Sequence, residues 1–304
     1  MTMAHRRLSV FLAVARFAVV AATLCQLPAS AAENLSFDSD GVKIRYVDRG
    51  PRDGEPVVLV HGFACNVEFQ WGPVVPKLAR EYRVIALDCR GHGKSDKPHD
   101  ADAYGLKMVD DVKRLLDHLQ LERAHIVGYS MGAGIAARFA AMYPDRTLSL
   151  VMGGAGVMPD AAFTRCLPDL VASLEKKGSM APLIMALNPP GAPPPTDFQL
   201  KSVDMVMMGM NDPQALAAMV RGFEPMLAAD AQRPASYWKG IEAPALGIVG
   251  GADPLRQSVE STGELLPDMR VVVVPGRDHV TTVMAPEFIK SIDEFLEAAS
   301  AATP

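Results

Sequence analysis

The chain has 304 residues, of which 49% are hydrophobic and 21% charged, the balance of a globular protein with a sizeable core. The formal net charge of −5 gives no support to nucleic-acid binding, which depends on clustered lysine and arginine. Once a leader peptide is set aside, about 270 residues remain, which fits one α/β domain with an insertion.

Residues 1–32 are predicted to be a signal peptide. A basic start at His5–Arg7 is followed by an apolar stretch, Leu8–Leu27, and then by the small residues of Pro28–Ala32 that a signal peptidase accepts. A retained membrane anchor is the alternative, because the apolar stretch is nearly long enough to span a bilayer. Arg16 in its middle argues against an anchor. We therefore expect a secreted or periplasmic protein with no stable membrane insertion after cleavage.

Eight segments are predicted to be strands. The first two alternate in hydrophobicity, and the other six are mostly apolar runs of the kind found in strands buried on both faces. They are Leu35–Phe37, Val42–Val47, Pro56–His61, Arg83–Asp88, Ala124–Gly128, Leu148–Met152, Ala245–Val249 and Val271–Val274. Helical patterns lie between them, for example at 106–119, 131–142 and 286–298. This alternation predicts an α/β fold: a mostly parallel eight-stranded sheet with helices on both faces, formed by residues 33–153 and 239–304.

Residues 154–238 contain no buried-strand pattern. Helix-like stretches at 160–176, 180–187, 198–208 and 213–227 are separated by loops, one of which is rich in proline, Asn188–Pro195. We predict that this segment is a helical cap inserted into the sheet domain.

The strongest local signal is Gly128-Tyr129-Ser130-Met131-Gly132, which follows a predicted buried strand and opens a predicted helix. A serine at so sharp a turn is held in a strained backbone conformation with its hydroxyl exposed above the sheet. The flanking glycines remove Cβ atoms that would collide with the strand and the helix. This pattern indicates a nucleophilic serine.

The chain resembles the α/β-hydrolase superfamily, as a serine-nucleophile, esterase-like member with a helical cap. His61-Gly62-Phe63 stands where that family builds its oxyanion hole, and the resemblance implies the backbone N–H groups of Phe63 and Met131 as donors. The segment Asp88–Ser95 is similar to a glycine-rich loop of structural importance in the family.

The same resemblance implies the other two members of a catalytic triad. Asp253, in Gly250–Pro254, matches the acid position after the penultimate strand, and His279 matches the base after the last strand. The chain order Ser130, Asp253, His279 is the order of this fold. Histidine takes the serine proton and returns it to the leaving group, while the aspartate fixes the imidazole tautomer.

Alternatives to these residues are less suited to the chemistry. Five further histidines, none of which follows the last strand, are expected to be structural or solvated: His61, His92, His99, His118 and His125. Asp278 is expected to be a solvated loop residue, since adjacent side chains diverge. No metal-ligand spacing and no nucleotide-binding loop are present in the sequence, so we expect neither a metal nor a cofactor.

Three cysteines remain after the predicted leader: Cys65, Cys89 and Cys166. A disulfide between Cys65 and Cys89 is possible, because they follow strands expected to be neighbours. Three free thiols are the equally favoured alternative.

The substrate is expected to be a small acyl compound. Tyr129 and Val280, next to catalytic positions, are predicted to line the acyl pocket together with Phe63 and Met131. The cap contributes flexible thioethers that suit either an adaptable apolar pocket or packing against the main domain: Met180, Met185, Met205, Met207, Met208, Met210, Met219 and Met226. We expect a neutral, small-to-medium ester or lactone. The alternatives are C–C bond or amide hydrolysis on the same fold, or a slow-turnover ligand-binding protein.

Overall fold

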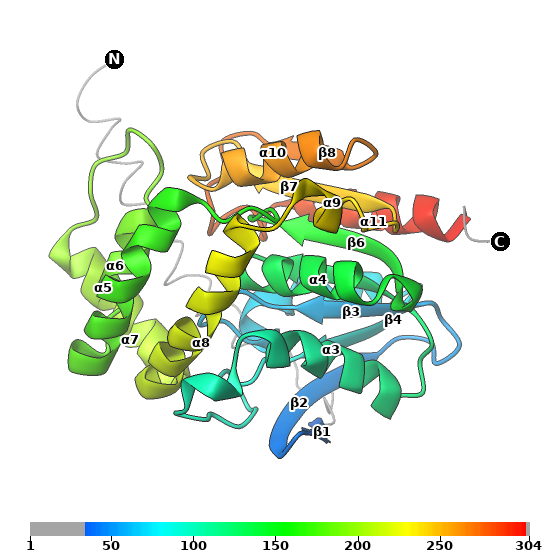
Figure 1. Cartoon of the computed structure of the whole chain (residues 1–304), viewed down its shortest axis with the longest axis horizontal. Coiled ribbons are helices and arrows are strands. Elements are labelled where there is room, and N and C mark those ends of the chain that lie inside the picture. Colours follow the sequence, from blue (N-terminus) through cyan, green and yellow to red (C-terminus); the bar gives the residue numbers. More distant parts are fainter. Residues whose placement is uncertain (1–33, 302–304) are drawn as a thin grey trace.

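The computed structural model describes residues 34–301, apart from the side chain of Ala162, and the predicted signal peptide lies outside this range. One eight-stranded sheet runs through the molecule in the order β1-β2-β4-β3-β5-β6-β7-β8 (Figure 1). Its strands are β1 (Leu35–Ser39), β2 (Val42–Arg49), β3 (Pro56–Val60), β4 (Arg83–Leu87), β5 (Ala124–Tyr129), β6 (Thr147–Gly153), β7 (Ala245–Gly250) and β8 (Arg270–Val274). β2 is antiparallel to β1 and β4. The other six strands, β3 to β8 in chain order, are parallel to one another. The predicted fold class is confirmed.

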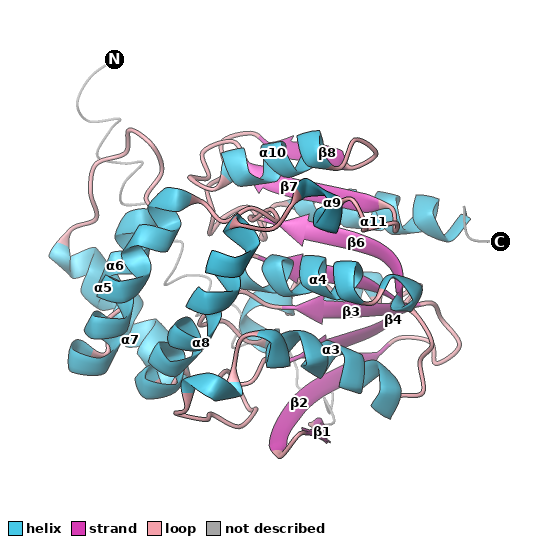
Figure 2. Cartoon of the chain, in the orientation of Figure 1, coloured by secondary structure: helices cyan, strands magenta, loops and turns pink. Residues whose placement is uncertain are grey.

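Helices cover both faces of this sheet (Figure 2). Buried side chains of α3 (Leu106–His118), α4 (Met131–Met142) and α10 (Arg256–Leu265) belong to one hydrophobic cluster. Those of α2 (Val75–Leu78), α11 (Pro286–Ala301) and the π-helical turn η1 (Val67–Trp71) belong to the other. The strands are apolar on both sides because each face is covered, which is why they appear in the sequence as unbroken runs.

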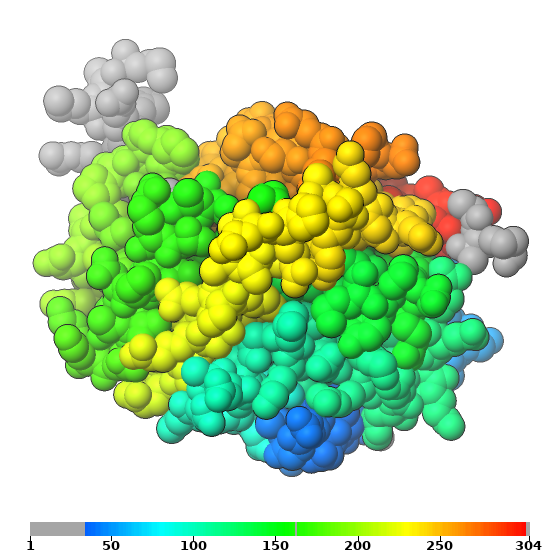
Figure 3. Space-filling view, viewed as in Figure 1, coloured from blue at the N-terminus to red at the C-terminus, as the bar shows by residue number. Residues whose placement is uncertain are grey.

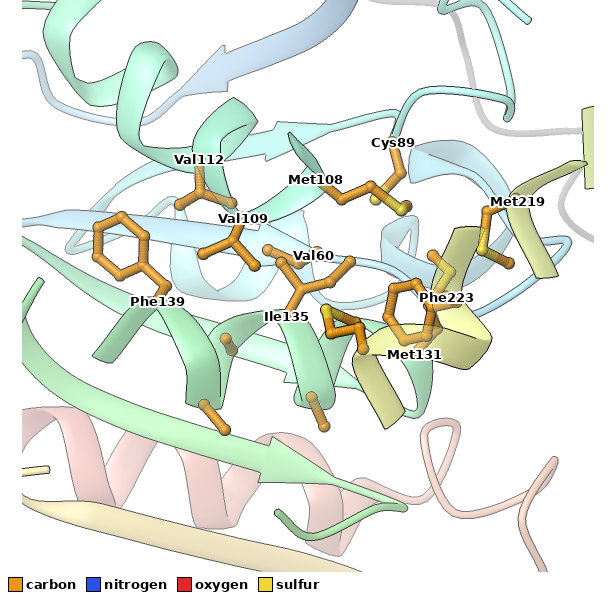
Figure 4. Packing of buried hydrophobic residues seen from close by; sticks show 14 of the residues in the cluster. Val60, Cys89, Met108, Val109, Val112, Met131, Ile135, Phe139, Met219 and Phe223 are labelled. Carbon is orange, nitrogen blue, oxygen red and sulfur yellow. The ribbon is translucent and has the colours of Figure 1, made fainter. Parts of the chain in front are cut away.

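The core next to the site is packed by β3, α3 and α4 (Figure 4). Val60, Val109, Ile135 and Phe139 are each fully buried there. Full burial of such a side chain is worth about 1.5–3 kcal/mol relative to exposure. The same cluster extends to Phe223 of the cap, so the sheet domain and the cap share one core.

Five helices follow β6 and precede β7: α5 (Ala161–Lys177), α6 (Ala181–Ala186), α7 (Asp197–Met210), α8 (Pro213–Ala231) and α9 (Ala235–Trp238). We call α5–α8 the cap. α5, α6 and α7 lie beyond the carboxyl ends of the parallel strands, and α8 leads back toward α9 and β7 (Figure 1). In the space-filling view this returning segment, in yellow, lies directly against the α3 and α4 region (Figure 3).

The predicted strands and long helices agree with the structure to within a few residues. α10 and the short helices η1, α2 and α9 were not predicted, because four or five residues carry too little periodicity and α10 is polar over most of its length. Cys65, Cys89 and Cys166 are all free thiols, so the disulfide considered above is not formed. Within residues 34–301, no helix combines the length and the apolar character needed to cross a bilayer.

Candidate active site

The turn between β5 and α4 holds Ser130 in a strained conformation, with φ 53° and ψ −114°. A non-glycine residue with positive φ is unfavourable and persists only where its surroundings impose it. A Cβ on Gly128 would lie 2.1 Å from the carbonyl oxygen of Gly132, and one on Gly132 would lie 2.0 Å from that of Val60. The two glycines are therefore needed for the helix to start so close to the strand, and this start lifts Ser130 to the edge of the sheet.

Ser130, His279 and Asp253 are joined in one hydrogen-bonded series. His279 Nε2 lies 2.9 Å from Ser130 Oγ, and His279 Nδ1 lies 2.9 Å from Asp253 Oδ2. Asp253 Oδ1 accepts a hydrogen bond from the Leu255 N–H at 2.9 Å, which fixes the carboxylate. An ionised carboxylate only accepts hydrogen bonds, so the proton of a neutral His279 sits on Nδ1 and leaves Nε2 free to accept from the serine hydroxyl.

Tyr129 supports this histidine from the strand side. Its hydroxyl donates to the carbonyl oxygen of His279 at 2.6 Å, and the two rings lie 5.6 Å apart between centroids. Tyr129 is buried, and burial raises the pKa of its phenol well above the usual value, so the hydroxyl remains a donor. The sequence placed Tyr129 in the pocket wall; the structure adds that it anchors the loop that carries His279.

The His61–Phe63 segment lies beside the serine. A Cβ on Gly62 would be 3.4 Å from Ser130 Cβ, and Phe63 lines the same cavity as Ser130. Met131 is the first residue of α4, where a backbone N–H has no partner within the helix. The structure therefore places Phe63 and Met131, the residues predicted to supply the oxyanion donors, in the wall of the cavity that Ser130 also lines.

Two side chains that the sequence did not single out hold this oxyanion loop, residues 61–66. Gln70 Oε1 accepts from the Gly62 N–H at 2.9 Å, and Asn211 Nδ2, at the end of α7, donates to the Ala64 carbonyl at 2.8 Å. Ala64 itself has a positive φ of 56°. Gln70 follows the oxyanion loop within η1 and Asn211 ends α7, but neither belongs to a recognised motif, so no spacing rule identifies them.

The other histidines are occupied elsewhere. His61 Nδ1 bonds the Gly62 carbonyl and its Nε2 accepts from the Cys89 N–H, while His92 Nδ1 bonds the Arg90 carbonyl. Burial lowers the pKa of His61 to about 4 and that of His92 to about 3, so both are neutral at pH 7. The remaining three hydrogen-bond to groups far from Ser130: His99 to Asp212, His118 to Tyr46 and His125 to Ser149.

Two neighbours of the site play no direct part in this geometry. Asp278 is not simply solvated as expected: its Oδ1 accepts hydrogen bonds from the N–H groups of Val280 and Thr281, which shapes the turn after His279. Cys65 lines the cavity, but burial raises the pKa of its thiol to about 12. The thiol is therefore protonated at neutral pH and does not compete with Ser130 as a nucleophile.

Above Ser130 lies a cavity of about 820 Å³, within the size range of small-molecule sites. Its walls are mostly apolar, and they include Val280 together with Met180, Met205, Met207 and Met219 of the cap.

Apart from His279, three ionisable acidic or basic side chains line this cavity, and each has a partner in the protein. Arg138 pairs with Asp230, Asp160 caps α5 through the Phe163 N–H, and Asp278 forms the turn described above. In the described part of the chain, no cluster of three or more histidine, cysteine or acidic residues could hold a metal ion.

Comparisons with known proteins agree with this architecture. The family described as the alpha/beta hydrolase fold matches residues 55–181. A 2-(acetamidomethylene)succinate hydrolase of Mesorhizobium japonicum is 29% identical over 81% of this chain and 89% of its own. A non-heme chloroperoxidase of Streptomyces lividans is 42% identical over 38% of this chain and 41% of its own.

An enol-lactonase from Burkholderia xenovorans LB400 superposes with a TM-score of 0.72 at 22% identity, over 86% of this chain and all of its own. That likeness concerns the fold. Several of the curated relatives are matched over only 30% to 64% of their own length.

Proposed function

The chain belongs to the α/β-hydrolase superfamily and is a hydrolase, and we propose that it is a serine hydrolase that cleaves a carboxylic ester or lactone through an acyl-enzyme on Ser130. The observation that carries this proposal is the hydrogen-bonded series Ser130–His279–Asp253, of which Ser130 and His279 line a mostly apolar cavity. No cofactor is needed for such a reaction.

The proposed mechanism follows from the positions of the protons. His279 Nε2 removes the hydroxyl proton as Ser130 Oγ attacks the carbonyl carbon, and Asp253 stabilises the resulting imidazolium without taking the proton itself. The N–H groups of Phe63 and Met131 stabilise the negative oxygen of the tetrahedral intermediate, at about 3 kcal/mol for one such donor. His279 then protonates the leaving alcohol. Water, activated by the same histidine, releases the acid.

A neutral, small-to-medium substrate is supported by the cavity. Arg138, the basic lining side chain other than His279, is paired with Asp230, so a negatively charged substrate would find no free counter-ion there. An apolar wall with few polar groups suits an acyl chain.

The test is hydrolysis of p-nitrophenyl acetate, butyrate, octanoate and palmitate by the mature protein and by Ser130→Ala. We expect one of the shorter chains to be preferred, and Ser130→Ala to lose at least about a thousandfold in kcat. A set of negatively charged esters serves as the specificity control and should react more slowly.

Other outcomes lead to other functions. If neither protein hydrolyses any ester, the ester proposal fails. C–C hydrolysis is then assayed with ring-fission products, and amide hydrolysis with anilides. Slow labelling of Ser130 with tight retention of the ligand, and no multiple turnover, would indicate a binding protein instead.

We also propose that the protein is exported and loses residues 1–32. Intact-mass measurement of the protein recovered from a secreting host tests this, because an uncleaved chain would retain the mass of that segment.

A further inference from the structure

Tyr129 immediately precedes the nucleophile in the chain, yet its hydroxyl bonds to the residue that serves as the base. It is the last residue of β5, a strand that lies between β3 and β6 and is buried along its whole length. The hydroxyl donates to the main-chain carbonyl of His279 at 2.6 Å, and only 4% of the Tyr129 surface is exposed. One strand therefore carries Ser130 at its end and holds the backbone of His279 through a side chain.

The loop that carries His279 is bonded to the other two parts of the triad. The carbonyl of Arg277 in this loop accepts from the Ala252 N–H at 2.9 Å, which joins it to the loop of Asp253. Further on, the Tyr129 bond joins the same loop to β5. The hydrogen bonds at the His279 nitrogens change as the proton moves during the reaction, whereas these two bonds involve no reacting proton. They can therefore hold the backbone beneath the imidazole from the first step to the last.

Glycines at the end of β6 leave room for both rings. A Cβ on Gly153 would lie 2.5 Å from Tyr129 Cδ2. One on Gly154 would lie 2.9 Å from Tyr129 Cζ and 3.1 Å from His279 Cε1. The Phe288 ring meets the Tyr129 ring edge-on, with the centroids 5.6 Å apart. The phenol is thus confined by packing, so its hydroxyl is in place before a substrate binds.

We propose that Tyr129 is a positioning residue for the reaction: its hydroxyl holds the main chain of His279 so that Nε2 meets first Ser130 Oγ and then the leaving group in the same place. This inference rests on the proposed function. A displacement of about 1 Å in a reacting group can cost about 100-fold in rate. Loss of this bond should therefore slow the chemical step more than it weakens substrate binding.

Tyr129→Phe tests the proposal, because it removes the hydroxyl and keeps the ring. Tyr104→Phe is the matched control. Tyr104 is also 4% exposed and donates to a main-chain carbonyl, that of Pro98, at 2.6 Å, but it lies outside the cavity wall. Urea unfolding should show comparable losses of stability in the two variants, since each loses one buried hydrogen bond of the same kind.

Two butyrate esters with different leaving groups give the kinetic readout. p-Nitrophenolate departs without a proton, whereas the ethoxide of ethyl butyrate must be protonated by His279. In Tyr129→Phe, kcat/KM should fall about tenfold on p-nitrophenyl butyrate and about 100-fold on ethyl butyrate. Tyr104→Phe should match wild type on both esters. Replacing Tyr129 by para-aminophenylalanine, which restores a donor, should recover most of the loss.

Proton NMR reports the geometry without turnover. The proton between His279 Nδ1 and Asp253 Oδ2 should give a far-downfield signal, which His279→Gln identifies by its loss. We expect this signal to shift or broaden in Tyr129→Phe and to stay unchanged in Tyr104→Phe.

Wild-type kinetics in Tyr129→Phe would overturn the proposal. Equal losses on the two esters, or equal losses in Tyr129→Phe and Tyr104→Phe, would also overturn it, because they indicate a general effect on packing. If wild type hydrolyses neither ester, the proposed function fails, and the NMR signal then decides the role of Tyr129. An unchanged signal in Tyr129→Phe overturns the positioning role, and a changed signal supports it.

Discussion

On the sheet side of the cavity, the residues that face the substrate are tied to one another. Ser130, His279 and Asp253 are linked by hydrogen bonds of 2.9 Å, and glycines with no room for a Cβ fix the backbone beneath them. On the cap side, most of the wall consists of methionines and other apolar side chains, which are held by packing, and Met205 is 79% exposed. Hydrogen bonds specify one geometry, whereas thioethers adapt to several. We infer that the sheet side carries out the reaction and the cap side selects the substrate.

The largest effect expected from the sheet side is at Asp253. Asp253→Asn should lower kcat about 10,000-fold, because an amide that donates to Nδ1 would stabilise the wrong tautomer of His279. Steady-state kinetics on the preferred ester give the measurement. Asp278→Asn is the matched control and should lose less than about tenfold, since Asn still accepts from the turn N–H groups. Equal losses in both variants would contradict the assignment of the acid to Asp253.

A glycine-to-alanine substitution should have opposite effects on stability on the sheet side and on the cap side. Gly132→Ala is expected to reduce the free energy of unfolding by about 3 kcal/mol, because its Cβ meets the Val60 carbonyl. Gly209→Ala in α7 of the cap meets no atom within 4 Å and should increase stability by about 0.5–1 kcal/mol. Urea unfolding of both variants measures these changes. If the free energy of unfolding changes in the same direction in both variants, the contrast between the two sides is wrong.

Acid should reduce the free energy of unfolding through two buried histidines, His61 and His92. The unfolded chain has histidine pKa values of about 6.5, while burial holds the pKa of His61 at about 4 and that of His92 at about 3. Below pH 6.5 these two imidazoles are therefore protonated in the unfolded chain but stay neutral in the folded chain. The free energy of unfolding thus falls as the pH is lowered toward 4. At pH 5 the loss should be about 2 kcal/mol for each histidine.

Urea unfolding at pH 7.5 and pH 5 measures that loss. His92→Gln should reduce the difference between the two pH values by about 2 kcal/mol. His99→Gln, at an exposed position, should leave the difference unchanged. An unaltered difference in His92→Gln would rule out buried His92 as a source of acid sensitivity.

The smallest effect is expected in the cap wall. Met207→Leu, at a buried position that lines the cavity, should change the free energy of unfolding by less than about 1.5 kcal/mol, since the volume is nearly kept. The ratio of octanoate to butyrate hydrolysis should shift by about tenfold, and kcat on the better ester should change less. A large loss of kcat on every ester would mean that the cap takes part in the reaction itself.

The sequence was informative where chemistry demands particular residues at particular turns. Gly128 and Gly132 mark the serine turn because no larger residue fits, and the apolar runs mark strands because both faces of the sheet are covered. The positions of Asp253 and His279 followed from the resemblance to a known family, and the structure brings them within hydrogen-bonding distance of one another and of Ser130.

What the sequence did not predict depends on side-chain contacts that no motif or periodicity specifies. Gln70 and Asn211 hold the oxyanion loop through side-chain bonds that follow no local pattern, and Arg138 of α4, which lines the cavity, pairs with Asp230 of α8. The methionines were recognised as a group, but which of them line the cavity depends on how α6, α7 and α8 turn toward the sheet.

The hydrogen bond from Asn211 to the Ala64 carbonyl joins the cap to the oxyanion loop. Helix α7 ends at that bond, so a change that shifts this helix also pulls on the loop that presents the Phe63 N–H. If the proposed function holds, a substitution that shifts α7 would move the predicted oxyanion donor as well as the cavity wall. A substitution in the cap wall that leaves Asn211 in place is therefore expected to reshape the cavity without disturbing residues 61–66.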